Sequence, residues 1–310
     1  MKKLLIAFLL IAVAALAACG GESTPVVTGP QDASGAPAGD ANPPADNSSA
    51  GPAALPADPQ AVTFQAADGQ ELHGYYYPAA VNPAPLVVLM HWVRGDMSDW
   101  YEIALWLQNR GQANPFTNPS VYLPNELWWE PSWFPPVPEG QSYGVFIFSF
   151  RGCAPYKAGC AGWTPDIWLL DAQAAMQTAV TLEGVDPPAK IVAIGSSVGA
   201  DGAPDACAWL NGQTPGACQG ALSLSPGSYM GIAYPVVVQQ LGASQPPVAA
   251  WCVADETEFG ICESAEISGN PAYRDFLIPT GQHGNMLLRP NLTPLPMQII
   301  LDFLAETVGP

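Results

Sequence analysis

The residues of this chain that could do chemistry begin with a serine in a Gly-x-Ser-x-Gly pattern. A β-branched run, Ile191 to Ile194, leads directly into Gly195, Ser197 and Gly199. A buried strand that enters so tight a turn needs glycines for close backbone approach, and the turn raises the Ser197 hydroxyl above the sheet edge. Ser196 lacks flanking glycines in this register. The pattern therefore predicts a nucleophile elbow with Ser197 as the nucleophile.

A serine hydroxyl is a poor nucleophile at neutral pH and needs a base. The chain offers three histidines, His73, His91 and His283. His73 falls in an early hairpin, whereas His283 is flanked by glycines in a loop from which an imidazole can reach over the sheet edge. We therefore predict that His283 takes the proton from Ser197 and later returns it.

The acid that would orient His283 has three candidates. The strand that begins at Pro247 is followed by Asp255, Glu256 and Glu258. Counting along the strand favours Glu256, whereas residue type favours Asp255. We expect Asp255 to be the acid, ahead of Glu256, with Glu258 third. The alternative for each carboxylate is a solvated loop charge.

The first residues predict export. Two lysines precede an apolar run from Leu4 to Ala15, which is too short to cross a bilayer and leads through small residues to Cys19. This pattern resembles a bacterial lipoprotein signal. The resemblance implies a signal peptide over 1–18, lipidation of Cys19 and an extracytoplasmic location, anchored by lipid to the bacterial cell envelope. Ordinary secretion with an unmodified cysteine is the alternative.

Residues 19–59 predict a disordered tether. They are rich in Ala, Pro, Gly, Asp, Ser and Thr, and they hold too few large apolar side chains to offset the entropy of ordering. The rest of the chain, 60–310, has the size of one α/β domain with its own core. The formal net charge of −18 argues against nucleic acid as a partner. It also disfavours contact with anionic lipid, so we expect membrane association through the N-terminal lipid alone.

Six cysteines besides Cys19 fall into three local couples. An even number in an exported chain indicates disulfides, and each couple closes a short loop. Free buried thiols are the alternative. No couple has the CxxC spacing of a zinc site, and we expect neither a metal nor a cofactor. The expected disulfides are Cys153–Cys160, Cys207–Cys218 and Cys252–Cys262.

Apolar runs of strand length alternate with stretches of helical spacing. This alternation predicts a mostly parallel central sheet with helices on both faces and an active site beyond the carboxyl ends of the strands. Ser197, His283 and the three acids all follow strand ends, so they can converge. We expect strands over 62–64, 71–77, 86–90, 144–150, 191–194, 220–224, 247–253 and 275–279, and helices over 100–107, 166–182, 200–210 and 296–306.

With these residues in this order, the chain resembles the α/β-hydrolase superfamily and is nearest in pattern to bacterial dienelactone-hydrolase-like esterases. The order nucleophile, acid, histidine is the one that this fold uses. The resemblance implies hydrolysis of a carboxylic ester through an acyl-enzyme. It covers about Val62 to Leu304 and rests on His91-x-x-x-Gly95 with Trp100, Phe150-Arg151-Gly152, the Ser197 elbow, Leu224-Ser225-Pro226-Gly227 and His283-Gly284.

The resemblance also implies an oxyanion hole built from two backbone N–H groups. One belongs to Val198, just after the nucleophile, and the other to Val93, in the loop after strand 86–90. His91 stands where the family's loop carries a non-catalytic histidine. Trp92 stands where such loops usually carry glycine, so the second donor is Trp92 in one alternative, and the loop is reshaped in another. The family's Gly-x-x-Asp spacing is absent before the acids.

Residues 112–141 form an aromatic and proline-rich insertion where the family needs only a short link. Such a segment beside an active site is a candidate lid or wall of the acyl pocket. An aromatic plug on the domain surface is the alternative, and carbohydrate stacking by the tryptophans is a further one. The aromatic residues are Phe116, Tyr122, Trp128, Trp129, Trp133 and Phe134.

The leading hypothesis is a serine esterase that acts on a small or medium, neutral or apolar carboxylic ester. The alternative is a catalytically weak or inactive hydrolase-fold lipoprotein that acts as a binding module, which Trp92 and the undecided acid favour. A peptidase or amidase is a third hypothesis. No additional domain or charged pocket in the sequence points to recognition of a peptide terminus.

Overall fold

The computed structural model describes residues 54–116, 129–153, 160–186 and 190–309. The expected signal peptide, Cys19 and most of the expected tether lie outside these residues. The last residues of the tether segment contact the domain, because Arg110 donates hydrogen bonds to the carbonyl of Leu55 and Gln108 donates one to the carbonyl of Ala57. The described contacts of the domain therefore begin before residue 60.

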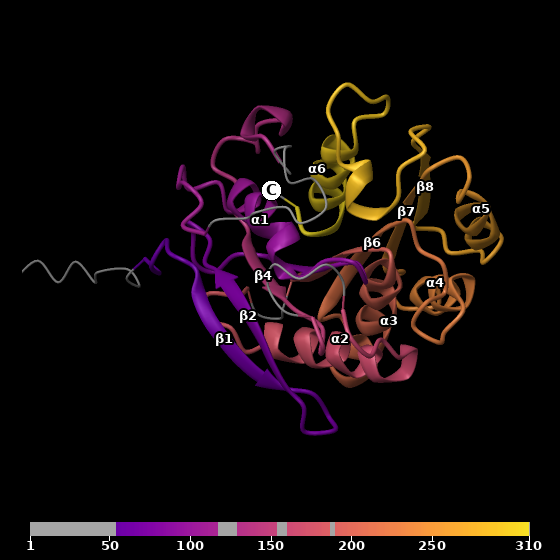
Figure 1. The fold of residues 1–310 in the computed structure, drawn as a ribbon, viewed down its shortest axis with the longest axis horizontal. Helices are drawn as coiled ribbons and strands as arrows, with labels where there is room; N and C mark the ends of the chain where they lie inside the picture. The colour runs from indigo at the N-terminus through magenta and orange to yellow at the C-terminus, as the bar shows by residue number, and fades with distance from the viewer. Residues whose placement is uncertain (1–53, 117–128, 154–159, 187–189, 310) are drawn as a thin grey trace, which may run out of the picture. The chain divides into compact units, whose positions relative to one another are not determined.

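An eight-stranded sheet forms the centre of the domain (Figure 1), with the order β1-β2-β4-β3-β5-β6-β7-β8. The β1–β2 and β2–β4 pairs are antiparallel, and all other neighbours are parallel. The strands are β1 (Gln60–Gln65), β2 (Glu71–Tyr77), β3 (Leu86–Met90), β4 (Gly144–Phe148), β5 (Ile191–Ser196), β6 (Cys218–Leu224), β7 (Ala249–Ala254) and β8 (Tyr273–Leu277).

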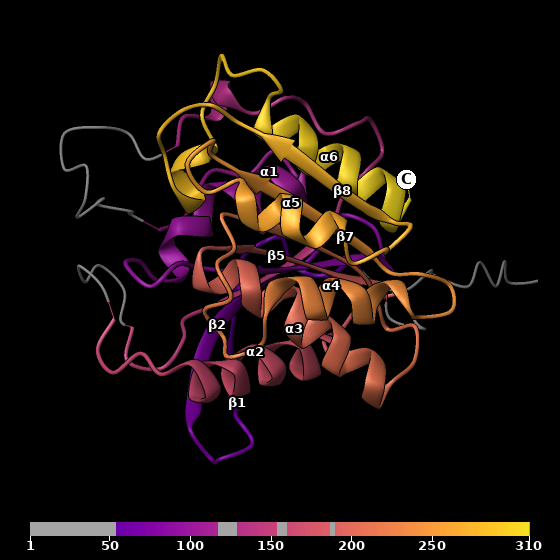
Figure 2. The same ribbon diagram turned by 90° about the vertical axis from the view of Figure 1, so that its right-hand side faces the viewer.

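Helices cover both faces of the sheet. α1 and α6 lie on one face, and α2, α3 and α4 lie on the other (Figure 2). This arrangement confirms the predicted fold class. The helices are α1 (Tyr101–Gln108), α2 (Pro165–Ala179), α3 (Val198–Gln213), α4 (Tyr234–Gly242), α5 (Gly260–Glu266) and α6 (Pro296–Thr307), with short 3₁₀ helices η1 (Met97–Trp100), η2 (Pro131–Trp133) and η3 (Gly284–Leu287).

Strand β3 shows why the apolar runs become the centre of the sheet. Successive side chains of a strand point to opposite faces. Leu86, Val88 and Met90 accordingly belong to the core under α2 and α3, whereas Val87 and Leu89 belong to the core under α1 and α6. A strand with helices on both sides must be apolar at every position, as this run is.

Two helices were not predicted from the sequence. α4 carries a Pro-Val-Val-Val run after Tyr234, whose β-branched residues do not favour a helix, although the proline is well suited to its first turn. α5 spans 7 residues and directly follows the acidic loop. Strand β8 begins at Tyr273, two positions before the expected start at residue 275. Within the described ranges, no helix is long and apolar enough to cross a membrane.

Candidate active site

Ser197 occupies the turn between β5 and α3 in a strained backbone conformation, with φ 53° and ψ −116°. Such a conformation is costly for a residue with a side chain and is typical of functional sites. A Cβ at Gly195 would collide with the carbonyl of Gly199, and a Cβ at Gly199 would collide with the carbonyl of Met90. The structure thus places Ser197 in the geometry of a nucleophile elbow, and both flanking glycines are required by close backbone approach.

Glu258 is the carboxylate that meets the histidine. Its Oε1 lies 2.7 Å from Nδ1 of His283, and both side chains are about one-third exposed, at 32% and 33%. The expectation that Asp255 is the acid is therefore wrong in this structure, and so is the second choice, Glu256, which is exposed. Asp255 and Glu256 come first in the loop after β7, and only the side chain of Glu258, further along the loop, reaches the imidazole.

Asp255 instead holds the backbone of two loops. Its buried carboxylate accepts hydrogen bonds from the backbone N–H groups of Thr257, Thr280 and Gly281 and from the Thr257 hydroxyl. Burial raises the pKa of Asp255, but these donors outweigh it and hold the pKa below its usual range. Because Thr280 and Gly281 lead to His283, Asp255 ties the acid loop to the histidine loop. It is a positioning residue.

The histidine loop packs against the elbow. The N–H of Gly284 donates to the Ser225 hydroxyl at 3.0 Å, and a Cβ at Gly284 would lie 3.7 Å from the backbone nitrogen of Ser197. Among the described residues, no hydrogen bond joins the Ser197 hydroxyl to the imidazole of His283. In ligand-free enzymes this bond is often long and tightens only when substrate binds.

Two backbone N–H groups remain for an oxyanion beside Ser197. Val198 is the first residue of α3, so its N–H has no acceptor inside the helix. Val93 lies in the loop between β3 and η1, and neither N–H donates to another group in the described part of the chain. The two segments touch, because Gly199 packs against the carbonyl of Met90 at the end of β3.

His91 is structural. Its Nε2 accepts the N–H of Phe150 at 3.0 Å, so the proton of the neutral ring is on Nδ1, which lies 2.7 Å from the carbonyl of Trp92. Burial lowers the pKa of His91 to about 4, against weaker opposing effects of the Trp92 carbonyl and Asp96. A neutral imidazole with both nitrogens occupied cannot serve as the base.

The three expected disulfides are formed in the structure: Cys153–Cys160, Cys207–Cys218 and Cys252–Cys262. The sulfurs of Cys153 and Cys160 and a nitrogen of His91 lie within 4.8 Å of one another, which is the spacing of a metal site. The disulfide and the hydrogen bonds of the imidazole occupy these atoms, so they do not offer a site for an ion.

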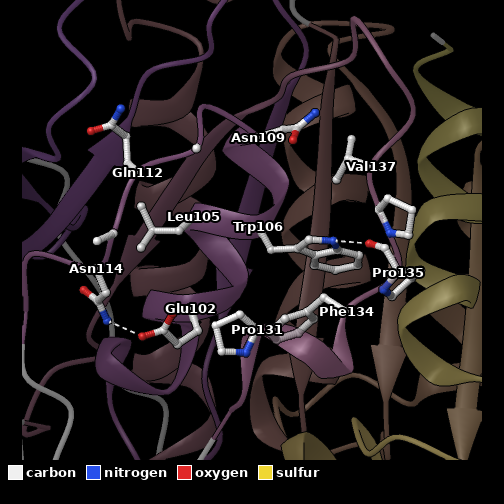
Figure 3. A pocket seen from close by; sticks show the side chains of 13 residues that line it. Glu102, Leu105, Trp106, Asn109, Gln112, Asn114, Pro131, Phe134, Pro135 and Val137 are labelled. Atoms are coloured by element: carbon white, nitrogen blue, oxygen red, sulfur yellow. Dashed lines mark hydrogen bonds between the residues drawn. The ribbon is translucent and has the colours of Figure 1, made fainter.

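The insertion has two described parts, 112–116 and 129–141, and much of it packs on the outside of α1 (Figure 3). Trp106 of α1 stacks on Phe134 with ring centroids 5.0 Å apart and donates its indole N–H to the carbonyl of Pro135. A cavity of about 470 Å³ lies between these groups, and none of the catalytic candidates lines it. This part of the insertion therefore fits the alternative of an aromatic plug on the domain surface.

Trp129 and Trp133 belong to a different environment. The indole of Trp129 donates to the carbonyl of Asp99 in η1, and the guanidinium of Arg289 lies over the rings of both tryptophans. Since η1 follows the Val93 loop and Arg289 follows η3, these tryptophans lie beside the two elements that flank the site. Trp128 and Tyr122 lie outside the described residues.

Several solved structures share this architecture. An esterase of Pyrococcus furiosus, Pf2001, superposes with a TM-score of 0.52 at 15% sequence identity, over 81% of this chain and 94% of that one. An esterase of Pyrobaculum calidifontis gives a TM-score of 0.52 at 13% identity, over 83% of this chain and 84% of that one. Dipeptidyl peptidase 4 of Porphyromonas gingivalis gives a TM-score of 0.50 at 13% identity, over 80% of this chain and 35% of that one.

No protein-family model and no curated protein sequence matches the chain. The solved structures, at such low identity, establish the fold. The protein has the α/β-hydrolase fold, and Ser197, Glu258 and His283 follow β5, β7 and β8.

Proposed function

We propose that this protein is a serine hydrolase that cleaves a carboxylic ester through an acyl-enzyme on Ser197. The observation that carries the proposal is the strained Ser197 elbow beside the Glu258–His283 pair. A serine held at positive φ, a histidine with its Nδ1 on a carboxylate and two backbone N–H groups left for an oxyanion together form the machinery of acyl transfer. The esterases among the structural neighbours support the same chemistry.

In the acylation step, Ser197 Oγ attacks the ester carbonyl while Nε2 of His283 removes the hydroxyl proton. Glu258 accepts the Nδ1–H of His283, which fixes the tautomer and stabilises the imidazolium. The N–H groups of Val198 and Val93 stabilise the oxyanion of the tetrahedral intermediate. The imidazolium then returns the proton to the leaving alcohol, and the C–O bond of the ester breaks.

Deacylation repeats these roles with water. His283 takes a proton from water, and the resulting oxygen nucleophile attacks the acyl carbonyl. The tetrahedral intermediate collapses, and the proton passes to Ser197 Oγ as the carboxylic acid leaves. His91 stays neutral throughout because it is buried and hydrogen-bonded at both nitrogens.

The decisive test combines turnover with covalent labelling. The wild type should hydrolyse p-nitrophenyl esters and take up a fluorophosphonate on Ser197, identified by peptide mapping. Ser197→Ala should lose both, whereas Ser196→Ala is the matched control at the adjacent buried serine. If Ser197→Ala keeps activity within about tenfold of the wild type, which corresponds to a barrier difference of only ~1.4 kcal/mol, the proposal is wrong.

The same experiment separates the competing functions. A non-catalytic binding module would show neither turnover nor labelling in the wild type. A peptidase or amidase would label on Ser197 but would hydrolyse p-nitroanilides of peptides better than esters. A panel of p-nitrophenyl esters of graded acyl length identifies the acyl group that the site prefers.

We further propose that the mature chain begins at Cys19, carries lipid there and is extracytoplasmic, anchored by this lipid to the bacterial cell envelope. The signal-like pattern before Cys19 supports this proposal. Mass spectrometry of the mature N-terminus tests it, because lipidation adds the mass of acyl chains that Cys19→Ser removes. A mature N-terminus with an unmodified Cys19 would contradict the anchor and leave the hydrolase proposal intact.

A further inference from the structure

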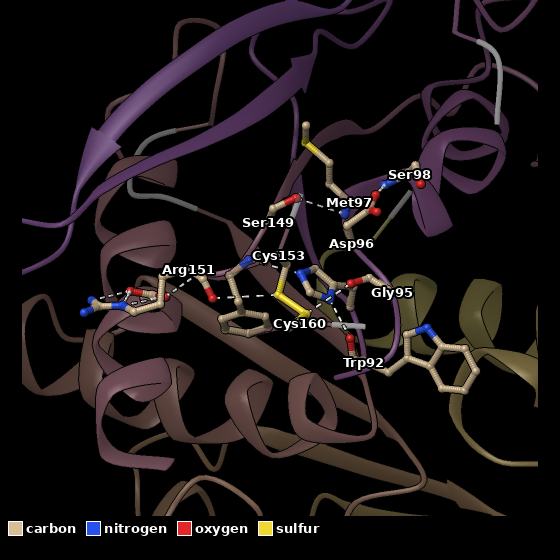
Figure 4. The surroundings of a disulfide bond; sticks show 12 residues. Trp92, Gly95, Asp96, Met97, Ser98, Ser149, Arg151, Cys153 and Cys160 are labelled. Carbon is tan, nitrogen blue, oxygen red and sulfur yellow. Dashed lines mark hydrogen bonds and ion pairs between the residues drawn. A yellow bond between two sulfur atoms is a disulfide. The ribbon is translucent and has the colours of Figure 1, made fainter. Parts of the chain in front are cut away.

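The Cys153–Cys160 disulfide lies against the loop from His91 to Gly95, which we call the oxyanion loop (Figure 4). The N–H of Cys160 donates to the carbonyl of Val93 at 3.2 Å. The Sγ of Cys160 lies 3.3 Å from the carbonyl oxygen of Gly95, as a contact, since a disulfide sulfur carries no proton. Two carbonyls of the oxyanion loop thus face one half of the disulfide.

The other half of the disulfide is fastened to the sheet. The N–H of Cys153 donates to the carbonyl of Phe150 at 3.1 Å, and the N–H of Phe150 donates to the imidazole of His91. Between them, Arg151 is held by its backbone N–H and its guanidinium on the buried carboxylate of Asp171. The disulfide therefore joins Cys160, and with it the oxyanion loop, to a rigid anchor at the end of β4.

The direction of the Val93 N–H depends on these attachments. The peptide between Trp92 and Val93 is planar, so its N–H points away from its own carbonyl. That carbonyl, of Trp92, accepts from Nδ1 of His91 at 2.7 Å and from the N–H of Gly95 at 3.2 Å. The next carbonyl, of Val93, is held by Cys160. The peptides on both sides of Val93 are thus fixed, and so is the direction of its N–H.

We propose that the Cys153–Cys160 disulfide is a positioning element of the oxyanion hole, and this inference rests on the proposed function. With the bond open, the segment of Cys160 keeps only the hydrogen bond from the N–H of Ala161 to the carbonyl of Gly152 at 3.0 Å, so the donor on the carbonyl of Val93 is held less firmly. The Val93 N–H then loses its alignment, while Ser197, His283 and Glu258 keep theirs. Because the oxyanion forms in the tetrahedral intermediate and the transition states that flank it, and not in the bound ester, kcat falls while KM is unchanged.

The first experiment compares two double variants that each lack one disulfide. Cys153→Ala/Cys160→Ala removes the disulfide beside the oxyanion loop. Cys207→Ala/Cys218→Ala is the matched control, because it frees α3 from the first residue of β6, at the amino end of that strand, whereas the site lies at the carboxyl ends of the strands. Both variants are assayed on p-nitrophenyl acetate at a temperature below the unfolding transition of either, and near-UV circular dichroism checks that each is folded.

We expect Cys153→Ala/Cys160→Ala to lower kcat about tenfold or more, since loss of one oxyanion donor costs roughly 10²–10³ in kcat and a misaligned donor costs less. KM should change less than threefold. The affinity for a trifluoromethyl ketone, whose serine adduct carries an oxyanion, should fall with kcat. The control should keep kcat within twofold. A merely structural disulfide would lower stability in both variants and leave kcat and the ketone affinity alike in both, which would overturn the inference.

The second experiment decides the matter if the double variant does not fold. Cys153 and Cys160 are partly exposed, whereas the other two disulfides are at most 1% exposed, so a phosphine reductant should open this bond first in the native protein. The phosphine becomes its oxide with oxygen from water, and the S–S bond gives two thiols. We expect kcat to fall in proportion to the fraction of molecules with this pair reduced, counted by alkylating a separate sample, and to return when the unalkylated protein is reoxidised.

Full reduction of this pair with unchanged kcat would overturn the inference. Failure of the proposed function looks different, since the wild type itself would then show no ester turnover and no fluorophosphonate on Ser197. If the wild type is active and labelled but Cys153→Ala/Cys160→Ala behaves like the control, the inference about the disulfide is wrong and the proposed function stands.

Discussion

Glu258 reaches His283 from beyond Asp255, so the carboxylate that begins the loop after β7 is not the one that meets the imidazole. The two acids have different roles. Glu258 contacts the base, and Asp255 fastens the loops that carry both the base and its acid. Substitutions at the two positions should therefore fail in different ways.

Glu258→Gln should lower kcat by about a hundredfold or more with little effect on stability, because a neutral amide no longer stabilises the imidazolium. Steady-state kinetics on a p-nitrophenyl ester measures this. Glu256→Gln is the matched control on the exposed neighbour and should stay within twofold of the wild type. Equal, small losses in both variants would place the acid elsewhere in the chain.

Asp255→Asn should destabilise the fold by roughly 1–3 kcal/mol, because the amide cannot accept all the hydrogen bonds that the carboxylate accepts. The pKa of Asp255 is held below its unfolded value, so its contribution to stability is present above about pH 4 and is lost as pH falls through the folded pKa. Urea unfolding between pH 3 and 7 should show the variant and the wild type converging at low pH. A constant difference across this range would contradict the assignment.

Asp205 should have the opposite pH dependence. It is 3% exposed inside α3, its oxygens have no hydrogen-bond partner among the described residues, and burial together with the charge of Asp201 raises its pKa to about 8. The folded protein therefore keeps a proton on Asp205 that the unfolded chain has released above about pH 4. The contribution of Asp205 to the free energy of unfolding is fully present below about pH 4 and is lost as pH rises toward 8.

Asp205→Asn should accordingly be more stable than the wild type at pH 7 to 8, by up to a few kcal/mol, with the difference shrinking toward pH 4. Urea unfolding over pH 4 to 9 measures it. Asp302→Asn, which makes the same substitution at an exposed position of α6, is the matched control. A variant that parallels the wild type at every pH would show that Asp205 is not held neutral.

Trp129→Ala/Trp133→Ala should weaken the preference among acyl chain lengths if these rings wall the acyl pocket. Each buried CH₂ is worth about 0.8 kcal/mol, so the slope of log(kcat/KM) against chain length reports the wall directly. Acetate esters should change little, since their acyl groups are too short to reach it. Trp106→Ala, which removes the stack on Phe134 outside α1, is the control with an unchanged slope. A folded variant with the wild-type slope would assign these tryptophans to the surface plug.

The sheet and the nucleophile could be predicted because local sequence dictates them. The five apolar residues of β3 can only be buried on both faces, and Gly195 and Gly199 are needed wherever the backbone approaches so closely. The acid could not be predicted, because Asp255, Glu256 and Glu258 differ only in where the loop turns. That turn is set by the donors at Thr280 and Gly281, which are distant in the sequence.

The strand order carries a consequence for how the protein matures. Val93, Ser197, Glu258 and His283 follow β3, β5, β7 and β8, and the last two strands are also the last to join this edge of the sheet along the chain. β6, β7 and β8 each pair with the strand that precedes them in the chain, so the loop of His283 is placed only when the last of these pairings has formed. A partly folded chain can thus hold the elbow but no base, and hydrolytic chemistry begins only when β7 and β8 have paired. Recovery of activity during refolding is therefore a report on completion of the whole sheet.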